Sequence, residues 1–244
     1  SYIWDDKERL IMNKEWNIFK NKISQEFNYD KDSFLQYKTI RQCLCPSHDS
    51  EQYVKLLQYV DSSIDKFPEI SKVGNPEFTS VHHQHIYYMS SIEYLFKRTF
   101  ESADITEIGG GFGNLCHLFK TYYNHTGEYT IVDLPELQEI QKFYLQKNKT
   151  YENVIFKNKW NDCKGDLLIS TFCIEEIDEE SRVGIPYDMF NYVYIIYNPN
   201  AFGVSHARYF KELEDKYSDK YTVKNEKDPN GRFRFTIKIK KWKI

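Results

Sequence analysis

The chain has 244 residues, with 33 Lys and Arg against 36 Asp and Glu, which gives a formal net charge of -3. This length suits one α/β domain with a helical extension, and the near balance of charge argues against a protein that holds nucleic-acid phosphates on a basic surface. Five cysteines without dense spacing do not suggest a disulfide framework, and no apolar run approaches the roughly 18 residues of a membrane span, so we expect a soluble cytoplasmic protein that binds neither nucleic acid nor membranes.

The first hundred residues are predicted to be helical. Apolar residues recur at helical spacing over 11–27 and 54–67, and again from about 84 to 100. The stretch 72–76, Lys-Val-Gly-Asn-Pro, is typical of a loop. We interpret residues 1–100 as a helical N-terminal extension that caps the site and contributes to the choice of acceptor.

Short apolar strands alternate with helices further along the chain. Five strands are expected, at 105–108, 129–132, 154–156, 166–172 and 191–197. Helices are expected through 115–119, 137–144 and about 205–217. This alternation predicts a doubly wound, mostly parallel sheet.

The C-terminal end follows a different pattern. Residues 221–225 and 233–239 are expected to be strands, because apolar and polar residues alternate along the second of them. The sequence Asp-Pro-Asn-Gly at 228–231 is typical of a hairpin turn. We therefore predict an α/β fold in which residues 101–244 form a seven-stranded Rossmann-like sheet with a C-terminal antiparallel hairpin.

The first strand leads into a glycine-rich segment, Glu-Ile-Gly-Gly-Gly-Phe-Gly at 107–113. Such a turn lets a ligand approach the backbone at the switch point of an open sheet. Dinucleotide-binding enzymes use G-x-G-x-x-G and seat a pyrophosphate on the helix that follows, but Asn114 stands where the third glycine would be. An acid at Glu107 suits a ligand with an ammonium and a sulfonium group. The segment therefore favours S-adenosylmethionine as cofactor, with S-adenosyl-L-homocysteine as product.

The remaining cofactor contacts are expected after the next strands. Asp133 ends the second strand, about 20 residues on, where an acid binds ribose hydroxyls; the alternative is a helix cap before Leu134. Adenine is expected against the segment after the third strand, and the methionine part against the end of the fourth. The predicted cofactor-binding residues are Glu107, Gly109, Gly110, Gly111, Gly113, Asp133, Leu134, Asn158, Trp160, Ser170 and Thr171.

Three segments together carry a family resemblance. They read Glu-Ile-Gly-Gly-Gly-Phe-Gly-Asn-Leu at 107–115, Tyr-Thr-Ile-Val-Asp-Leu-Pro-Glu at 129–136 and Asp-Leu-Leu-Ile-Ser-Thr-Phe-Cys-Ile-Glu-Glu at 166–176. In these motifs the chain resembles the sugar O-methyltransferases, which are class I S-adenosylmethionine-dependent enzymes. Asp-Leu-Pro-Glu is the most specific part. The resemblance implies methyl transfer to a sugar hydroxyl, on a free sugar, a nucleotide-linked sugar or a glycan.

Such a transfer needs an aligned acceptor and a base for its proton. These groups come from loops beyond the carboxyl ends of the strands. We expect His206 or Glu176 to be the base, and no metal. The predicted substrate-binding residues are His83, His85, Tyr87, Glu175 and Asn198.

Each of these assignments has an alternative. The acidic run 175–180 also suits a solvated helix start, and His206 also suits a hydrogen-bonded histidine without a catalytic role. The sequence His-His-Gln-His at 82–85 is compatible with a metal cluster, whereas Cys43-x-Cys45 lacks the second pair of a zinc site.

Rival functions are also open. Asn-Pro-Asn-Ala at 198–201 only partly matches the motif with which amino-methyltransferases grip a flipped base. Besides such a nucleic-acid methyltransferase, the rival functions are a non-catalytic binding module with the same fold and a nicotinamide oxidoreductase. The chain begins at Ser1 without a methionine, which leaves open that it is one domain of a longer polypeptide. A homodimer is one option for its assembly.

Overall fold

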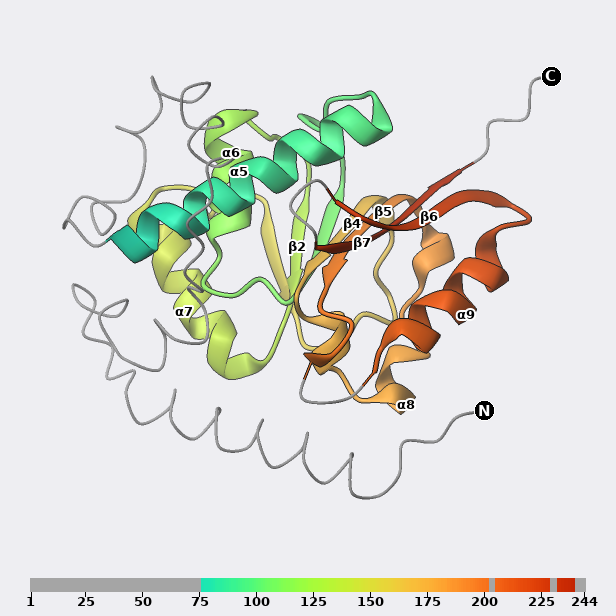
Figure 1. The fold of residues 1–244 in the computed structure, drawn as a ribbon. Helices are drawn as coiled ribbons and strands as arrows, with labels where there is room; N and C mark the ends of the chain where they lie inside the picture. Colours follow the sequence, from blue (N-terminus) through green and yellow to red (C-terminus); the bar gives the residue numbers. More distant parts are fainter. Residues whose placement is uncertain (1–75, 202–204, 229–231, 240–244) are drawn as a thin grey trace.

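The computed structural model describes residues 76–201, 205–228 and 232–239 (Figure 1). The helices expected at 11–27 and 54–67 lie outside the described residues, as do Cys43 and Cys45. The side chains of His82 and His83 are also outside them.

A seven-stranded sheet forms the centre of the described part of the chain, in the order β3-β2-β1-β4-β5-β7-β6. β7 runs antiparallel to both of its neighbours, and the other pairs are parallel. The strands are β1 (Ile105–Ile108), β2 (Tyr129–Val132), β3 (Val154–Lys157), β4 (Gly165–Thr171), β5 (Phe190–Tyr197), β6 (Tyr221–Lys227) and β7 (Phe233–Ile239). The predicted doubly wound sheet with a closing antiparallel hairpin is confirmed, with strand ends within two residues of those expected.

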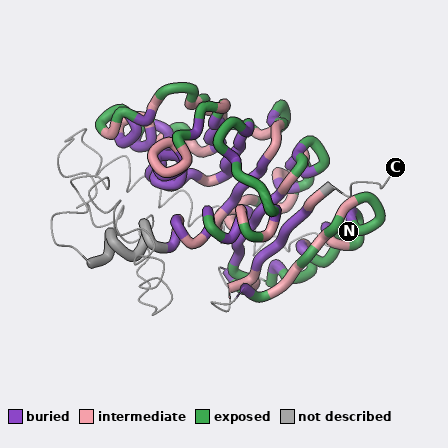
Figure 2. Tube along the Cα trace, turned by 90° about the horizontal axis from the view of Figure 1, so that it is seen from above, coloured by how far each residue is buried: buried purple, intermediate pink, exposed green. Residues whose placement is uncertain are grey.

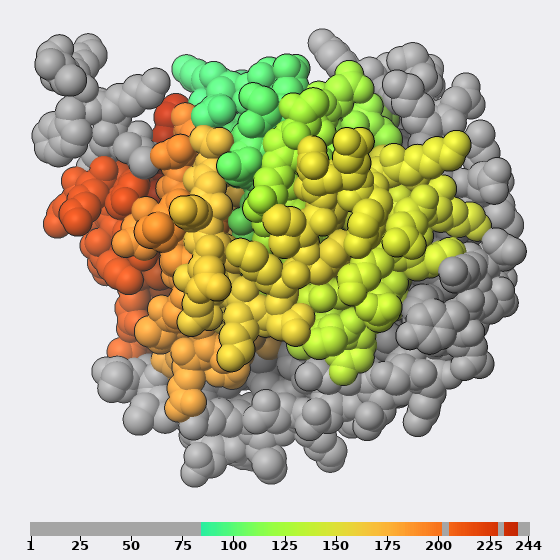
Figure 3. All heavy atoms as spheres, turned by 180° about the vertical axis from the view of Figure 1, so that it is seen from behind, coloured from blue at the N-terminus to red at the C-terminus, as the bar shows by residue number. Residues whose placement is uncertain are grey.

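Helices cover both faces of the sheet, as Figure 1 shows. On one side lie α5 (Pro76–Phe96), α6 (Asn114–Tyr122) and α7 (Pro135–Lys147), and on the other lie α8 (Glu179–Arg182) and α9 (Ala207–Tyr217). Two short 3-10 helices, η3 (Ile174–Glu176) and η4 (Tyr187–Met189), connect β4 to β5. In the space-filling view of Figure 3, α7, the segment around β3 and the β4–β5 connection form one continuous surface.

Two apolar cores result, one on each face. Along β4, Leu167 and Ile169 belong to the core under α5, α6 and α7, while Leu168 belongs to the core under α9. This alternation follows from the two-residue period of a strand. The tube coloured by burial shows buried residues along the central strands (Figure 2).

Helix α5 differs from its prediction. It begins at Pro76, eight residues before the expected start near 84, and ends at Phe96. Proline is favoured in the first turn of a helix because it has no N–H to donate there, so Pro76 starts the helix and does not belong to the preceding loop. Lys97 follows with φ of 53°, which ends the helix. The part of α5 from Ile86 to Phe96 shares its apolar core with the sheet. The separate extension over 1–100 stays a prediction.

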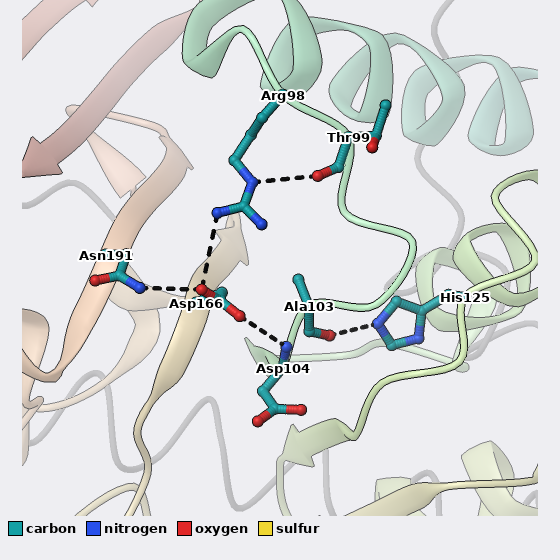
Figure 4. Close-up of polar contacts among 7 residues, drawn as sticks. All are labelled: Arg98, Thr99, Ala103, Asp104, His125, Asp166 and Asn191. Carbon is teal, nitrogen blue, oxygen red and sulfur yellow. Dashed lines mark hydrogen bonds and ion pairs between the residues drawn. The ribbon is translucent and has the colours of Figure 1, made fainter.

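A polar cluster joins the loop after α5 to the amino ends of β4 and β5 (Figure 4). Asp166 accepts hydrogen bonds from Asn191 Nδ2 at 3.0 Å and from the Asp104 backbone N–H at 3.3 Å. The guanidinium of Arg98 lies 3.8 Å from the same carboxylate and 4.9 Å from the centre of the Phe100 ring. The cluster lies at the end of the sheet opposite the glycine-rich segment.

Asp166→Ala is expected to lower the free energy of unfolding by about 1–2 kcal/mol, because it removes an acceptor that holds three partners. Chemical denaturation measures this change. Glu139→Ala is the matched control: it removes a single exposed ion pair with Lys142 on α7, which is worth about 0.5 kcal/mol or less. Equal effects of the two substitutions would contradict a stabilising role for the Asp166 cluster.

Candidate functional site

The glycine-rich segment forms a tight turn between β1 and α6. Gly109, Gly111 and Gly113 have φ of 78°, 56° and 94°, a backbone region that L side chains rarely adopt. A Cβ on Gly109 would lie 2.3 Å from Cys173 Cβ, whereas a Cβ on Gly111 would meet no atom of the described residues within 4 Å. Gly109 is therefore required by packing, and the side of the loop at Gly111 is open to a ligand.

Four carboxyl groups surround this loop. Glu107 lies on β1, Asp133 follows β2, and Glu175 and Glu176 lie in η3 after β4. Burial raises the pKa of each: to about 8 for Glu107 and Glu176, about 7 for Glu175 and about 6 for Asp133. The charges of Glu175 and Asp133 raise the pKa of Glu176 further. The charge of Asp133 likewise raises the pKa of Glu107, whereas the charge of Arg182 lowers that of Glu175.

Hydrogen bonds hold two of these carboxyls against the loop. Glu107 is buried and accepts from the Tyr129 hydroxyl at 2.9 Å, so it orders the loop from beneath. Asp133 Oδ1 accepts from the Leu134 backbone N–H at 2.8 Å, and Oδ2 accepts from Gln141 Nε2 at 2.7 Å. The same Gln141 nitrogen donates to the Gly111 carbonyl at 3.0 Å. Gln141, a residue that sequence reasoning missed, thus joins the second acid to the glycine loop.

Glu175 has a different environment. Its side chain is buried, and Oε1 accepts from the Asn198 backbone N–H at 2.8 Å. Oε2 has no hydrogen-bond partner within the part of the chain that the structure describes. A buried carboxylate oxygen without a partner is costly, and a cationic ligand group would relieve that cost. Glu175 and Asn198, both predicted to bind substrate, are thus joined through the Asn198 backbone, and their contact with a substrate stays a prediction.

Four further predicted cofactor residues lie at the end of β4 or in the segment after β3. Ser170 is buried and donates its hydroxyl to the Ile108 carbonyl at 2.9 Å. Asn158 Oδ1 accepts from Gln138 Nε2 at 2.8 Å, and Trp160 packs against the core under α9. Thr171 is half-buried at the end of β4. Ser170 therefore braces β1 against β4, and its predicted contact with a ligand is not supported by its orientation.

The surroundings of His206 argue against its predicted role as the base. The ring is buried; Nδ1 lies 3.2 Å from Arg182 Nη1, and Nε2 lies 3.2 Å from the Ala201 carbonyl. Because arginine can only donate, Nδ1 accepts and Nε2 carries the proton. Burial and the charge of Arg182 lower the pKa of His206 to about 4. Neither nitrogen is available for a substrate proton, and the histidine joins the β5–α9 loop to α8.

The predicted acceptor residues on α5 lie beside the loop. His85 Nδ1 is 2.9 Å from Nδ2 of Asn114, the first residue of α6. The Tyr87 hydroxyl donates to Asp228 Oδ2 at 3.1 Å and so contacts the hairpin between β6 and β7. His83 lies on α5, with its side chain outside the described residues. No set of three or more His, Cys, Asp or Glu side chains among the described residues is placed to hold a metal ion.

The chain is similar to solved structures but matches no known family by sequence. No family model matches the chain, and no curated protein matches it either. Solved structures with a similar arrangement include a SAM-dependent methyltransferase from Aquifex aeolicus, 16% identical, with 69% of this chain and 95% of that chain covered and a TM-score of 0.42. An rRNA methylase from Escherichia coli is 11% identical, with 96% and 92% covered and a TM-score of 0.47. An O-methyltransferase family protein from Burkholderia thailandensis is 10% identical, with 77% and 70% covered and a TM-score of 0.46.

These TM-scores are all below 0.5, so the fold class is assigned from the topology of the sheet. The order β3-β2-β1-β4-β5-β7-β6, with β7 antiparallel and helices on both faces, is that of the Rossmann-like methyltransferase fold. The glycine loop between β1 and α6 lies at the switch point of this sheet, where ligands of open α/β folds bind. None of the described helices is long and apolar enough to cross a bilayer.

Proposed function

We propose that the chain is an S-adenosylmethionine-dependent methyltransferase that acts on a sugar hydroxyl. The observation that carries the proposal is the convergence of four carboxyl groups with raised pKa values around a glycine loop that is open at Gly111. S-adenosylmethionine brings an ammonium and a sulfonium, and these charges offset those of the carboxylates. A dinucleotide would bring a pyrophosphate, which the same carboxylates repel.

The residues present fit this cofactor. The open backbone at Gly111 allows a close approach, and the partly exposed Asp133 stands at the end of β2, where ribose hydroxyls are bound in such folds. Among the described residues, Oε2 of Glu175 has no hydrogen-bond partner, and the charge of Glu175 raises the pKa of Glu176. When bound, S-adenosylmethionine supplies an electrophilic methyl group.

The proposed base is Glu176. It is half-buried after β4, and a pKa raised to about 8 makes its carboxylate a stronger base than an ordinary glutamate. Such a group accepts the proton of an acceptor hydroxyl as the oxygen attacks. The sugar as acceptor is supported by the resemblance of residues 107–115, 129–136 and 166–176 to sugar O-methyltransferases.

Calorimetric titration at pH 8 tests the cofactor. S-adenosylmethionine and S-adenosyl-L-homocysteine are expected to bind. NAD is expected to give no heat, because carboxylates would repel its pyrophosphate and because the loop lacks the third glycine of the dinucleotide-binding motif. Circular dichroism of the same sample shows that the protein is folded. Binding of NAD without S-adenosylmethionine would favour an oxidoreductase, and a folded protein that binds neither would favour a non-catalytic module.

A further inference from the structure

Arg232 contacts residues of α5 and the residue that follows β4. Its guanidinium carbon is 5.8 Å from the centre of the Tyr88 ring on α5 and 5.7 Å from that of Phe172, which follows β4. It donates to the Tyr88 hydroxyl, and the Gln84 amide oxygen, turned toward it, accepts from both terminal nitrogens at 2.7 and 2.8 Å. These contacts orient the planar guanidinium.

His85 stands on the same helix and is oriented by a second set of contacts. The Tyr144 hydroxyl donates to Asn114 Oδ1 at 3.1 Å, which directs the Asn114 amide nitrogen to His85 Nδ1 at 2.9 Å. His85 Nδ1 therefore accepts, and Nε2 carries the proton. Burial and the charge of Arg232 lower the pKa of His85 to about 4, so the ring is neutral at pH 7. His85 offers an N–H donor at this position.

Both side chains lie next to the proposed cofactor loop. Asn114 directly follows Gly113, and Phe172 directly precedes Cys173, whose side chain packs on Gly109. Phe172 has φ of 56°, and its N–H donates to the Ile196 carbonyl at 2.8 Å. Non-glycine residues in this backbone region are uncommon and occur preferentially at functional sites. Arg232 and His85 both keep part of their surface exposed.

Charged groups stand on two sides of the loop. The four carboxyls come from β1, the end of β2 and η3, whereas the guanidinium and the imidazole N–H come from the residue before β7 and from α5. The second side also holds the buried carboxylate of Asp228, which accepts from the Arg232 backbone N–H at 2.9 Å and from the Tyr87 hydroxyl at 3.1 Å. A cationic cofactor is favoured near the first group. The second group offers hydrogen-bond donors beside a positive charge, which is the arrangement that holds phosphate or carboxylate oxygens.

We infer that Arg232 and His85 bind an anionic group of the acceptor, so that the acceptor is a sugar carrying a phosphate or a carboxylate and not a neutral sugar. This inference rests on the proposed methyltransferase function and specifies its substrate class. Sequence reasoning had placed His85 near the acceptor but had missed Arg232, Asn114 and Phe172.

Calorimetry on the full chain saturated with S-adenosyl-L-homocysteine tests the inference, with glucose 1-phosphate, glucuronate and glucose as probes. At least one anionic probe is expected to bind at least about tenfold more tightly than glucose, since charge-assisted bidentate bonds exceed neutral ones. Arg232→Gln is expected to remove this preference and Arg232→Lys to retain part of it. Arg208→Gln, on the exposed face of α9, is expected to leave it unchanged.

The result shows which anionic group is bound, and it distinguishes failure of this inference from failure of the proposed function. Preference for glucose 1-phosphate over glucuronate identifies a phosphate, and the reverse identifies a carboxylate. Equal binding of all three probes, binding of none, or an unchanged preference in Arg232→Gln would overturn the inference while binding of S-adenosyl-L-homocysteine persists. Failure of the unmodified chain to bind S-adenosyl-L-homocysteine contradicts the proposed function instead. Because Arg232 contacts Tyr88, the Tm of each variant is measured, and Arg232→Lys keeps the test valid if Arg232→Gln does not fold.

Discussion

Replacing Gly111 with alanine is expected to weaken binding of S-adenosylmethionine by about 100-fold, on the order of 3 kcal/mol, while the protein stays folded. The added Cβ meets no atom within 4 Å in the part of the chain that the structure describes, so the substitution is expected to cost the fold the strain of a left-handed alanine, about 1 kcal/mol. The methyl group instead projects to the side of the loop where we place the cofactor. Calorimetry measures the affinity, and chemical denaturation measures the free energy of unfolding.

Gly109→Ala is the matched comparison, because it adds the same methyl group to the same loop. Here the Cβ would lie 2.3 Å from Cys173 Cβ and 2.4 Å from Cys173 Sγ. Overpacking and the left-handed backbone together are expected to lower the free energy of unfolding by about 3 kcal/mol. The double variant Gly109→Ala, Cys173→Gly removes the clash and is expected to recover part of this loss. If Gly111→Ala binds the cofactor normally, the ligand does not lie on the open side of the loop.

The strands and the glycine loop were predictable because their signals are local. Each strand is a short apolar run bounded by turn residues, and the left-handed glycines of the loop occupy positions that few other residues tolerate. The antiparallel end of the sheet was predictable for the same reason, from alternation along 233–239 and a turn sequence at 228–231. The start of α5 was misplaced because Pro76 was assigned to the loop before it.

The residues that sequence reasoning missed depend on contacts between distant parts of the chain. Arg232 contacts Tyr88, 144 positions away in the sequence. The contact forms because β7 pairs with β5 in the sheet and α5 packs over these strands. His206 carried the pattern of a polar residue near a helix start, yet Arg182 lies against it across the fold and occupies Nδ1. No local pattern distinguishes a histidine that points into a site from one that points into the core.

The carboxyl groups make the stability of the cofactor-free protein depend on pH. Because the pKa of Glu107 and of Glu176 is about 8 in the folded chain against 4.5 ordinarily, the folded state holds protons that the unfolded state has released. Their contribution is present below pH 4.5 and is lost as pH rises through 8. His85 and His206, with pKa values lowered to about 4 from 6.5, act in the opposite direction between pH 4 and 6.5. A net fall is therefore expected above pH 6.5, of at least about 2 kcal/mol by pH 8.5.

Glu176→Gln is expected to raise the free energy of unfolding at pH 8.5 by about 1–3 kcal/mol, because it removes one of the carboxyls that must ionise beside the others. The same substitution is expected to flatten the pH dependence of the free energy of unfolding. It is also expected to weaken binding of S-adenosylmethionine, because a negative charge that attracts the cationic cofactor is lost. Urea denaturation and calorimetry between pH 6.5 and 8.5 measure the two effects. Glu180→Gln, an exposed acid of α8, serves as control and is expected to change neither.

A gain in stability coupled to a loss of affinity would show that Glu176 is kept charged for the ligand and not for the fold. Amides cannot accept a proton, so Glu176→Gln also removes the proposed base, and methyl transfer to any acceptor should fall even where the cofactor is saturating. If the variant shows the wild-type pH profile of stability, Glu176 does not share the charged region with Glu175 and Asp133. The base would then have to be sought among the other groups around the loop, such as Glu175, whose Oε2 accepts no hydrogen bond from the described residues.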